Sequence, residues 1–88
     1  MTSKATARFW RGFDALPAPI QQLARKTYQR WRQNPAHPSL HYKKLHGGVG
    51  RFSIRVGQHY RALGREIPGG VEWVWIGTHA EYDQLLRR

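Results

Sequence analysis

The longest regular pattern of apolar side chains lies in the first half of the chain. Between residues 20 and 31, apolar and small side chains recur at helical spacing and predict one stripe of an amphipathic helix: Ile20, Leu23, Ala24, Thr27, Tyr28 and Trp31. Asp14 suits the N-terminal cap region, and Pro17 and Pro19 suit the first turn, where no N–H partner is needed. A residue that precedes proline is pushed out of the α region, so the helix is expected to end at Asn34.

Apolar and polar residues alternate in other parts of the chain, which predicts strands. Residues 4–10 are expected to form an N-terminal strand. The second half predicts an antiparallel meander, with strands at 51–56, 60–65 and 71–77 and turns at 57–59 and 68–70. Its last strand is almost wholly apolar, which indicates an inner strand. Residues 83–86 are predicted to form a short terminal helix.

Together these elements predict a single α+β domain over residues 1–88. An N-terminal strand and a long helix would pack on a mainly antiparallel, twisted sheet, and a short C-terminal helix would follow the last strand. A chain of 88 residues is long enough for one modest core and no more. The sequence contains no cysteine, which excludes disulfides and thiolate zinc sites. It has no apolar run of the roughly 20 residues that span a bilayer and no secretory signal pattern, so we expect a cytoplasmic protein.

Charge changes this picture more than any other feature of the composition. Lys and Arg number 15 against 5 acidic residues, which gives a formal net charge of +10. No acidic residue occurs from Ala15 to Arg65, and the acids gather in the last third of the chain. A small basic domain with segregated charge is expected to bind a polyanion or an acidic partner. The alternative is a basic protein whose charges only keep it soluble.

Alternation in the first meander strand separates its charges from its apolar side chains. Arg51 and Arg55 fall on one face, opposite Phe52 and Ile54. If the long helix covers the apolar face, the arginines line the open one. Clustered cations among aromatic residues suit single-stranded nucleic acid, and the predicted RNA-binding residues are Lys43, Lys44, Arg51, Arg55 and Arg65. Each of them alone could equally be a solvated charge.

Three segments carry a resemblance to a known family. HPSLHYKKLHG, SIRVGQHYRAL and WIGTHAEYDQLL are similar, in order and spacing, to the RelE/ParE superfamily of toxins from type II toxin–antitoxin systems. The resemblance covers nearly the whole chain and implies the α+β fold described above. It also implies an antitoxin partner, whose acidic segment would cover the basic face. Members similar to RelE, HigB and YafQ are metal-independent endoribonucleases that cut mRNA, commonly on the ribosome. ParE-like members keep the fold without the nuclease residues and inhibit DNA gyrase.

RNA cleavage by the neighbouring 2′-hydroxyl needs a base, cations for the charged phosphorane and an acid for the leaving oxygen. Histidine suits proton transfer at neutral pH. The resemblance implies that Arg61 stabilises the transition state and that His79, in a YafQ-like Gly-Thr-His, is catalytic. Tyr82 follows His79 at helical spacing and could stack a base or relay a proton. No metal or cofactor is implied, and no acid lies between Asp14 and Glu66 to act as the base found in YoeB-like members.

Each of these residues also has a structural alternative. His79 could be the first residue of a terminal helix that Thr78 caps, with no part in chemistry. Tyr82 could be an aromatic anchor that fixes the chain end to the sheet. The sequence therefore predicts a ribonuclease toxin, with a gyrase-directed, non-enzymatic toxin as the alternative function.

Overall fold

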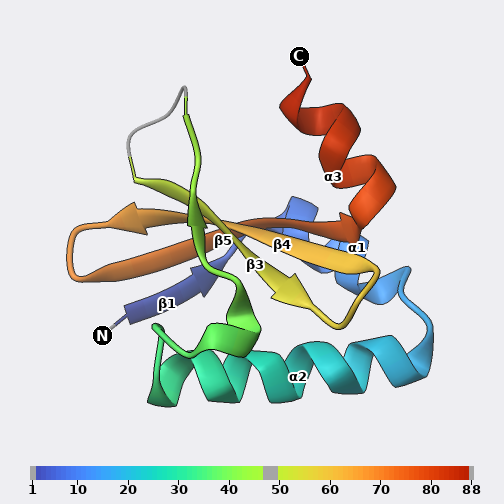
Figure 1. The fold of residues 1–88 in the computed structure, drawn as a ribbon, viewed down its shortest axis with the longest axis horizontal. Helices are drawn as coiled ribbons and strands as arrows, with labels where there is room; N and C mark the ends of the chain where they lie inside the picture. Colours follow the sequence, from blue (N-terminus) through green and yellow to red (C-terminus); the bar gives the residue numbers. More distant parts are fainter. Residues whose placement is uncertain (1, 47–49, 88) are drawn as a thin grey trace.

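A computed structural model describes residues 2–46 and 50–87 (Figure 1). Gly47, which ends the motif HPSLHYKKLHG, lies outside the described residues, as do residues 1, 48, 49 and 88. The described elements are, in chain order, β1 (Thr2–Ala5), α1 (Ala7–Asp14), α2 (Ala18–Gln33), the 3-10 helix η1 (Pro38–Leu40), β2 (Lys43–Lys44), β3 (Arg51–Val56), β4 (Tyr60–Ile67), β5 (Gly70–Thr78) and α3 (His79–Leu86). No helix in the described ranges is long and apolar enough to cross a membrane.

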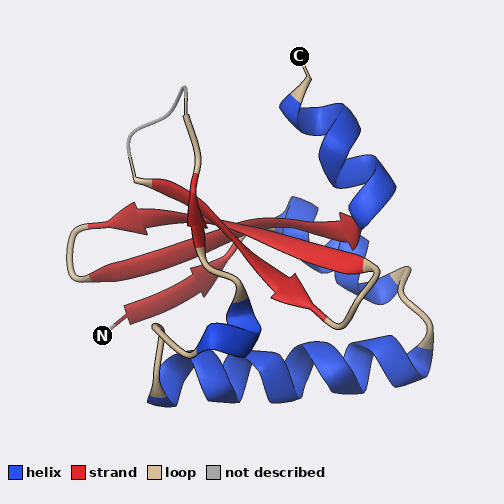
Figure 2. Cartoon of the chain, viewed as in Figure 1, coloured by secondary structure: helices blue, strands red, loops and turns tan. Residues whose placement is uncertain are grey.

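The strands form one five-stranded sheet in the order β1-β5-β4-β3-β2 within the described residues. The β3-β4-β5 meander is antiparallel as predicted, and β2 adds to it antiparallel to β3. β1 pairs with β5 in parallel, with Thr2 opposite Gly70 and Ala5 opposite Trp73. β5 is therefore an inner strand. The predicted α+β class is confirmed, and Figure 2 shows the long helix below the sheet and the terminal helix on the other side.

The predicted strand over residues 4–10 is wrong in its second half. Only Thr2–Ala5 is a strand, and a helix begins at Ala7. Thr6 caps this helix, because its side chain accepts a hydrogen bond from the backbone N–H of Phe9 at 3.1 Å. The helix places Phe9 and Phe13, four residues apart, on one face against the core. The wrongly predicted part, residues 7–10, is only four residues long, and alternation over so short a segment fits a helix as well as a strand.

The long helix begins later than the sequence suggested. Asp14 is the last residue of α1 rather than a cap of α2, and Pro17 occupies the N-cap position of α2. Pro19 lies in the first turn and Asn34 is the C-cap, as predicted. The apolar stripe faces the sheet, and its Ala24 and Trp31 are buried.

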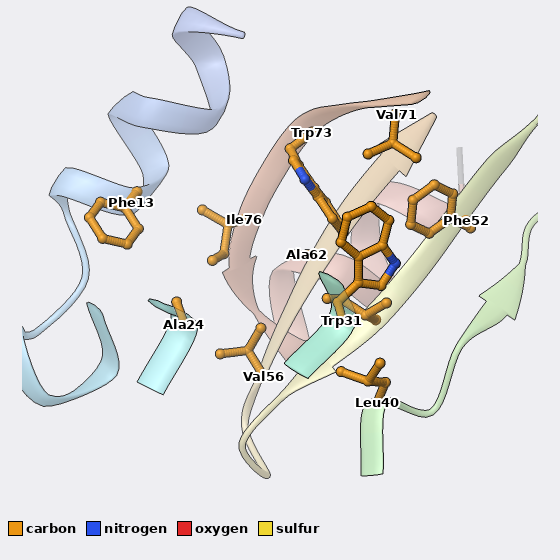
Figure 3. Packing of buried hydrophobic residues seen from close by; sticks show 11 residues of the cluster. Phe13, Ala24, Trp31, Leu40, Phe52, Val56, Ala62, Val71, Trp73 and Ile76 are labelled. Atoms are coloured by element: carbon orange, nitrogen blue, oxygen red, sulfur yellow. The ribbon is translucent and has the colours of Figure 1, made fainter. Parts of the chain in front are cut away.

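The main core lies between the sheet and the pair α1 and α2 (Figure 3). Trp31 of α2 packs edge-on against Trp73 of β5, with ring centroids 5.1 Å apart, and Phe52 of β3 contacts the same indole at 5.4 Å. The most deeply buried side chains are Phe52, Leu40 and Val56. Leu40 belongs to η1, so the segment after α2 is anchored under the sheet before the chain enters β2.

Helix α3 starts four residues earlier than predicted, at His79. Thr78 and Glu81 form a capping box: the Thr78 side chain accepts from the Glu81 N–H at 3.1 Å, and the Glu81 carboxylate accepts from the Thr78 N–H at 2.9 Å. The hydrogen bonds that Thr78 donates lower the pKa of Glu81. The cap turns the chain sharply out of β5 and onto the sheet face that α1 and α2 leave open.

Candidate functional site

Five basic residues lie on the sheet face opposite α1 and α2, which we call the cationic face. Residues directly opposite each other in an antiparallel ladder share a face. The ladder pairs Lys43 with Ser53, Arg51 with Arg65 and Arg55 with Arg61, while Phe52 and Ile54 point to the core. The residues of this face are thus Lys43, Arg51, Arg55, Arg61 and Arg65.

Lys44 does not belong with the other predicted RNA-binding residues. It pairs with Phe52 in the ladder, which puts it on the helix side of β2. Both lysines are exposed. Since adjacent strand residues alternate faces, only Lys43 can add its charge to the cationic face.

The two ends of the cationic face differ in how far acids compensate the arginines. Arg51 and Arg65 stand four residues away from Arg55 and Arg61, about 13 Å along the strands. At their end, Arg65 forms an ion pair with Glu72 at 2.7 Å. The Arg55 and Arg61 end lies beside the start of α3 and has no acid at ion-pair distance from either guanidinium in the described residues. We call it the proximal end.

Arg61 is the central cation of the proximal end. Its guanidinium is partly buried and donates through Nη1 to the carbonyl of Tyr60 at 2.9 Å. Burial lowers the pKa of Arg61, neighbouring Arg55 lowers it further, and Tyr82 and Asp83 act in the opposite direction. Arginine keeps its charge in spite of such shifts. Because Arg61 is partly buried and lies beside the like charge of Arg55, a bound anion would stabilise its charged form.

His79 stands at the same end, directly after β5. Its backbone N–H donates to the carbonyl of His59 at 2.7 Å, which ties the start of α3 to the β3–β4 turn. Its side chain is 46% exposed, and Nδ1 lies 3.4 Å from the Asp83 carboxylate one helical turn later. A proton on Nδ1 facing Asp83 leaves Nε2 as the nitrogen that can exchange protons with a ligand.

Tyr82 is a buried residue rather than a surface ring. It is 6% exposed, and its hydroxyl shares a hydrogen bond of 3.0 Å with the hydroxyl of Ser53, itself 3% exposed. Its ring centroid lies 6.1 Å from that of His79, so the predicted neighbourhood is present. Burial leaves the ring no open face on which a base could stack, and the arrangement matches the anchoring alternative. A proton relay through Tyr82 stays a prediction.

Removing the hydroxyl of Tyr82 is expected to destabilise the fold. Tyr82→Phe leaves the Ser53 hydroxyl buried without a partner and should lower the free energy of unfolding by about 1–3 kcal/mol. Urea denaturation followed by tryptophan fluorescence measures this. The double variant Ser53→Ala/Tyr82→Phe removes both partners and should lose less than the two single changes together. Tyr60→Phe is the matched control, because the Tyr60 hydroxyl makes no hydrogen bond with the described residues. Equal losses for Tyr82→Phe and Tyr60→Phe would contradict the anchor.

Three residues of this region were not among the predicted site residues. The capping box of Thr78 and Glu81 is visible in the sequence and marks the start of the terminal helix. A helix that starts there places Asp83 one turn after His79. Ser53 lies between Arg51 and Arg55 on the same face of β3, and only the packing of α3 shows that it is covered. His41, which contacts Arg55, has no signal in the sequence, because its position depends on the turn after η1. No group of three or more His, Cys, Asp or Glu that could hold a metal ion occurs in the described part of the chain.

Comparisons with known proteins identify the family and agree with the fold. Residues 18–84 match the family model described as ParE-like toxin domain. No curated protein matches significantly. Among solved structures, the chain is similar to the RelB-RelE antitoxin-toxin complex from Methanococcus jannaschii, with TM-score 0.75, 14% identity and coverage of 93% of this chain and 96% of that one.

Two further solved structures have the same fold. YafQ from E. coli strain BL21(DE3) gives a TM-score of 0.75 at 10% identity, covering 92% of this chain and 96% of that one. The YoeB/ParE toxin from Agrobacterium tumefaciens gives 0.72 at 18% identity, covering 90% and 99%. At such identities the likeness concerns the fold.

Proposed function

Since the chain belongs to the ParE-like toxin domain family, which is part of the RelE/ParE superfamily, it is a toxin of a toxin–antitoxin system, and we propose that it acts as an endoribonuclease. In this proposal it cleaves mRNA without a metal, in association with the ribosome, and so inhibits translation in the cytoplasm. The observation that supports it best is the proximal end, where Arg55 and Arg61 face each other across the β3–β4 ladder and His79 follows the end of the neighbouring strand β5.

The chemistry can be written with the residues of the proximal end. A base removes the proton of the 2′-hydroxyl, O2′ forms a bond to phosphorus, and the bond from phosphorus to the 5′-oxygen breaks. The leaving oxygen takes up a proton, giving a 2′,3′-cyclic phosphate and a 5′-hydroxyl. Arg61, with Arg55, stabilises the additional charge on the phosphorane. His79 carries one of the two protons through Nε2, and Asp83 holds the ring.

Mapping of RNA ends in cells tests the proposal directly. Primer extension on a reporter mRNA after a pulse of expression should show new 5′ ends with a preferred codon phase. The alternative is a ParE-like toxin that inhibits DNA gyrase without enzymatic activity. Intact mRNA together with an induced DNA-damage response would reject the nuclease in favour of that alternative.

Binding to RNA is expected to weaken steeply with salt. If Lys43, Arg51, Arg55 and Arg61 each neutralise one phosphate, the slope of log affinity against log salt should be about −2.8, because each contact with a single strand contributes about 0.7. Fluorescence anisotropy of a labelled oligonucleotide, with His79→Ala to prevent cleavage, measures it. Arg55→Gln should reduce the steepness by about 0.7, and Lys44→Gln, on the other side of β2, should leave it unchanged. A flat dependence would mean that the cationic face does not bind nucleic acid.

We further propose that a cognate antitoxin covers the cationic face with an acidic segment. The net charge of +10 and the acid-free stretch from Ala15 to Arg65 support such a partner. The solved structures to which the fold is similar include toxin–antitoxin complexes, such as RelB-RelE and DinJ-YafQ. Co-purification with the product of an adjacent small reading frame tests this pairing. A chain that is harmless when expressed alone and retains no partner would argue against it.

A further inference from the structure

Arg55 is held by two acceptors, and one of them is an imidazole. Its Nε donates to the carbonyl of Gly57 at 2.8 Å, and its Nη1 lies 3.2 Å from Nε2 of His41. A guanidinium has no acceptor, so Arg55 donates and Nε2 of His41 accepts. The ring nitrogen that accepts carries no proton, which places the proton of a neutral His41 on Nδ1.

The backbone of His41 is in an unusual conformation at this position. His41 is the C-cap of η1 with φ 47° and ψ 48°, and it is the one non-glycine residue with positive φ among the described residues. Left-handed backbone is uncommon for residues other than glycine, and at His41 it is accompanied by local contacts. Its N–H donates to the carbonyl of Pro38, and the preceding residue, Leu40, is 1% exposed. The buried anchor of η1 therefore fixes the turn that presents His41 to Arg55.

The consequence is a fixed orientation for one of two neighbouring cations. Arg55 and Arg61 face each other across the β3–β4 ladder, where like charges repel. The two contacts of Arg55 are to Gly57 and His41, and neither involves Arg61. Holding Nε and Nη1 of Arg55 leaves its Nη2 group, which has no hydrogen bond to the described residues, as the donor that a ligand can reach.

We propose that His41 is a positioning residue, which orients Arg55 so that the Arg55–Arg61 pair binds one phosphate of a single-stranded RNA. The inference rests on the proposed nuclease function and specifies its substrate contact. His41 does not touch the reacting atoms, and its effect on RNA passes through Arg55. A phosphate held by two guanidiniums is a charge-assisted contact with fixed geometry.

A double-mutant cycle on His41 and Arg55 tests the proposal. His41→Gly suits the left-handed backbone and removes the acceptor, and it should weaken binding of a 2′-deoxy-blocked RNA oligonucleotide about tenfold, the loss expected for a hydrogen bond to a charged group. His41→Gln brings a carbonyl oxygen close to the position of Nε2 and should restore most of the affinity. In the background of Arg55→Ala, His41→Gly should have no further effect. An equal loss in both backgrounds would overturn the inference.

A second measurement needs no RNA. Two-bond 15N correlations of the free protein should show neutral His41 as the Nδ1–H tautomer, and Arg55→Ala should return it toward the Nε2–H form that predominates in a free histidine. An Nε2–H tautomer in the wild type would overturn the inference even if the protein cleaves RNA. Cleavage of an unblocked RNA by the wild type tests the proposed function separately, so the two failures can be told apart.

Discussion

His79→Ala is expected to lower the rate of RNA cleavage by about 10²–10⁴-fold, the usual contribution of a positioned proton-transfer group. The side chain of His79 is half exposed at the proximal end, and its Nδ1 faces Asp83, so that Nε2 is available to exchange a proton. Affinity for RNA should change little, because a neutral imidazole supplies little of the attraction to phosphate. Single-turnover cleavage of a labelled oligonucleotide gives the rate, and anisotropy gives the affinity.

Two matched variants separate chemistry from folding. His59→Ala removes another exposed histidine of the same end and keeps the backbone carbonyl that accepts from His79, so cleavage should stay near the wild-type rate. Asp83→Asn keeps the shape of the partner but removes its charge, and it should lower the rate less than His79→Ala does. If His79→Ala cleaves RNA as fast as the wild type, Thr78-His79 is a helix start without a chemical role, and catalysis would have to depend on the arginines.

Arg61→Ala is expected to reduce kcat/KM by about 10²–10³-fold, the effect of removing one donor that stabilises developing charge. Unlike His79→Ala, it should also weaken RNA binding, since the charge of Arg61 acts on the bound phosphate before and during the reaction. Arg61→Lys should recover only part of the loss, because an ammonium cannot reproduce the planar fork of a guanidinium. Steady-state kinetics over a range of RNA concentrations measures both parameters.

Arg65→Ala provides the comparison for Arg61→Ala. Arg65 lies on the same strand and the same face four residues later, but Glu72 engages its guanidinium at 2.7 Å. Because that exposed ion pair contributes little to stability, the variant should fold normally and lose little activity. Similar losses at both positions would mean that the whole cationic face acts as one diffuse charge. Unchanged toxicity in both His79→Ala and Arg61→Ala would reject the nuclease and favour the gyrase alternative.

The long elements of the fold could be predicted because their patterns extend over several turns or strands. The stripe from Ile20 to Trp31 spans three helical turns, and the meander alternates over three strands with turns between them. The segment after Ala5 could not be predicted in this way, because four residues do not distinguish a period of two from a period of 3.6. There the hydrogen bond from the Phe9 N–H to Thr6 and the packing of Phe13 determine the helix.

The candidate site could be predicted as a set of residue types but not as an arrangement. Alternation placed Arg51 and Arg55 on one face, and the ladder has them there. The ion pair between Arg65 and Glu72 depends on how β4 pairs with β5, and the alternation within one strand does not reveal that pairing. The cover over Ser53 depends on the path of α3 across the sheet. Contacts between distant segments therefore separate the proximal end from the other arginines.

The place of β5 in the sheet has a consequence for the order in which the molecule can be assembled. The strand that lies between β1 and β4 is the last of the described strands in sequence, and its parallel partner β1 is separated from it by 68 residues at Thr2 and Gly70. Until β5 is available, β1 has no strand partner, β4 has an unpaired edge, and α3 has no strand end from which to start. Closing such a long loop is entropically unfavourable and slows folding. The proximal end needs β4, β5 and α3 together, so a nascent chain from which β5 has not yet emerged cannot form it.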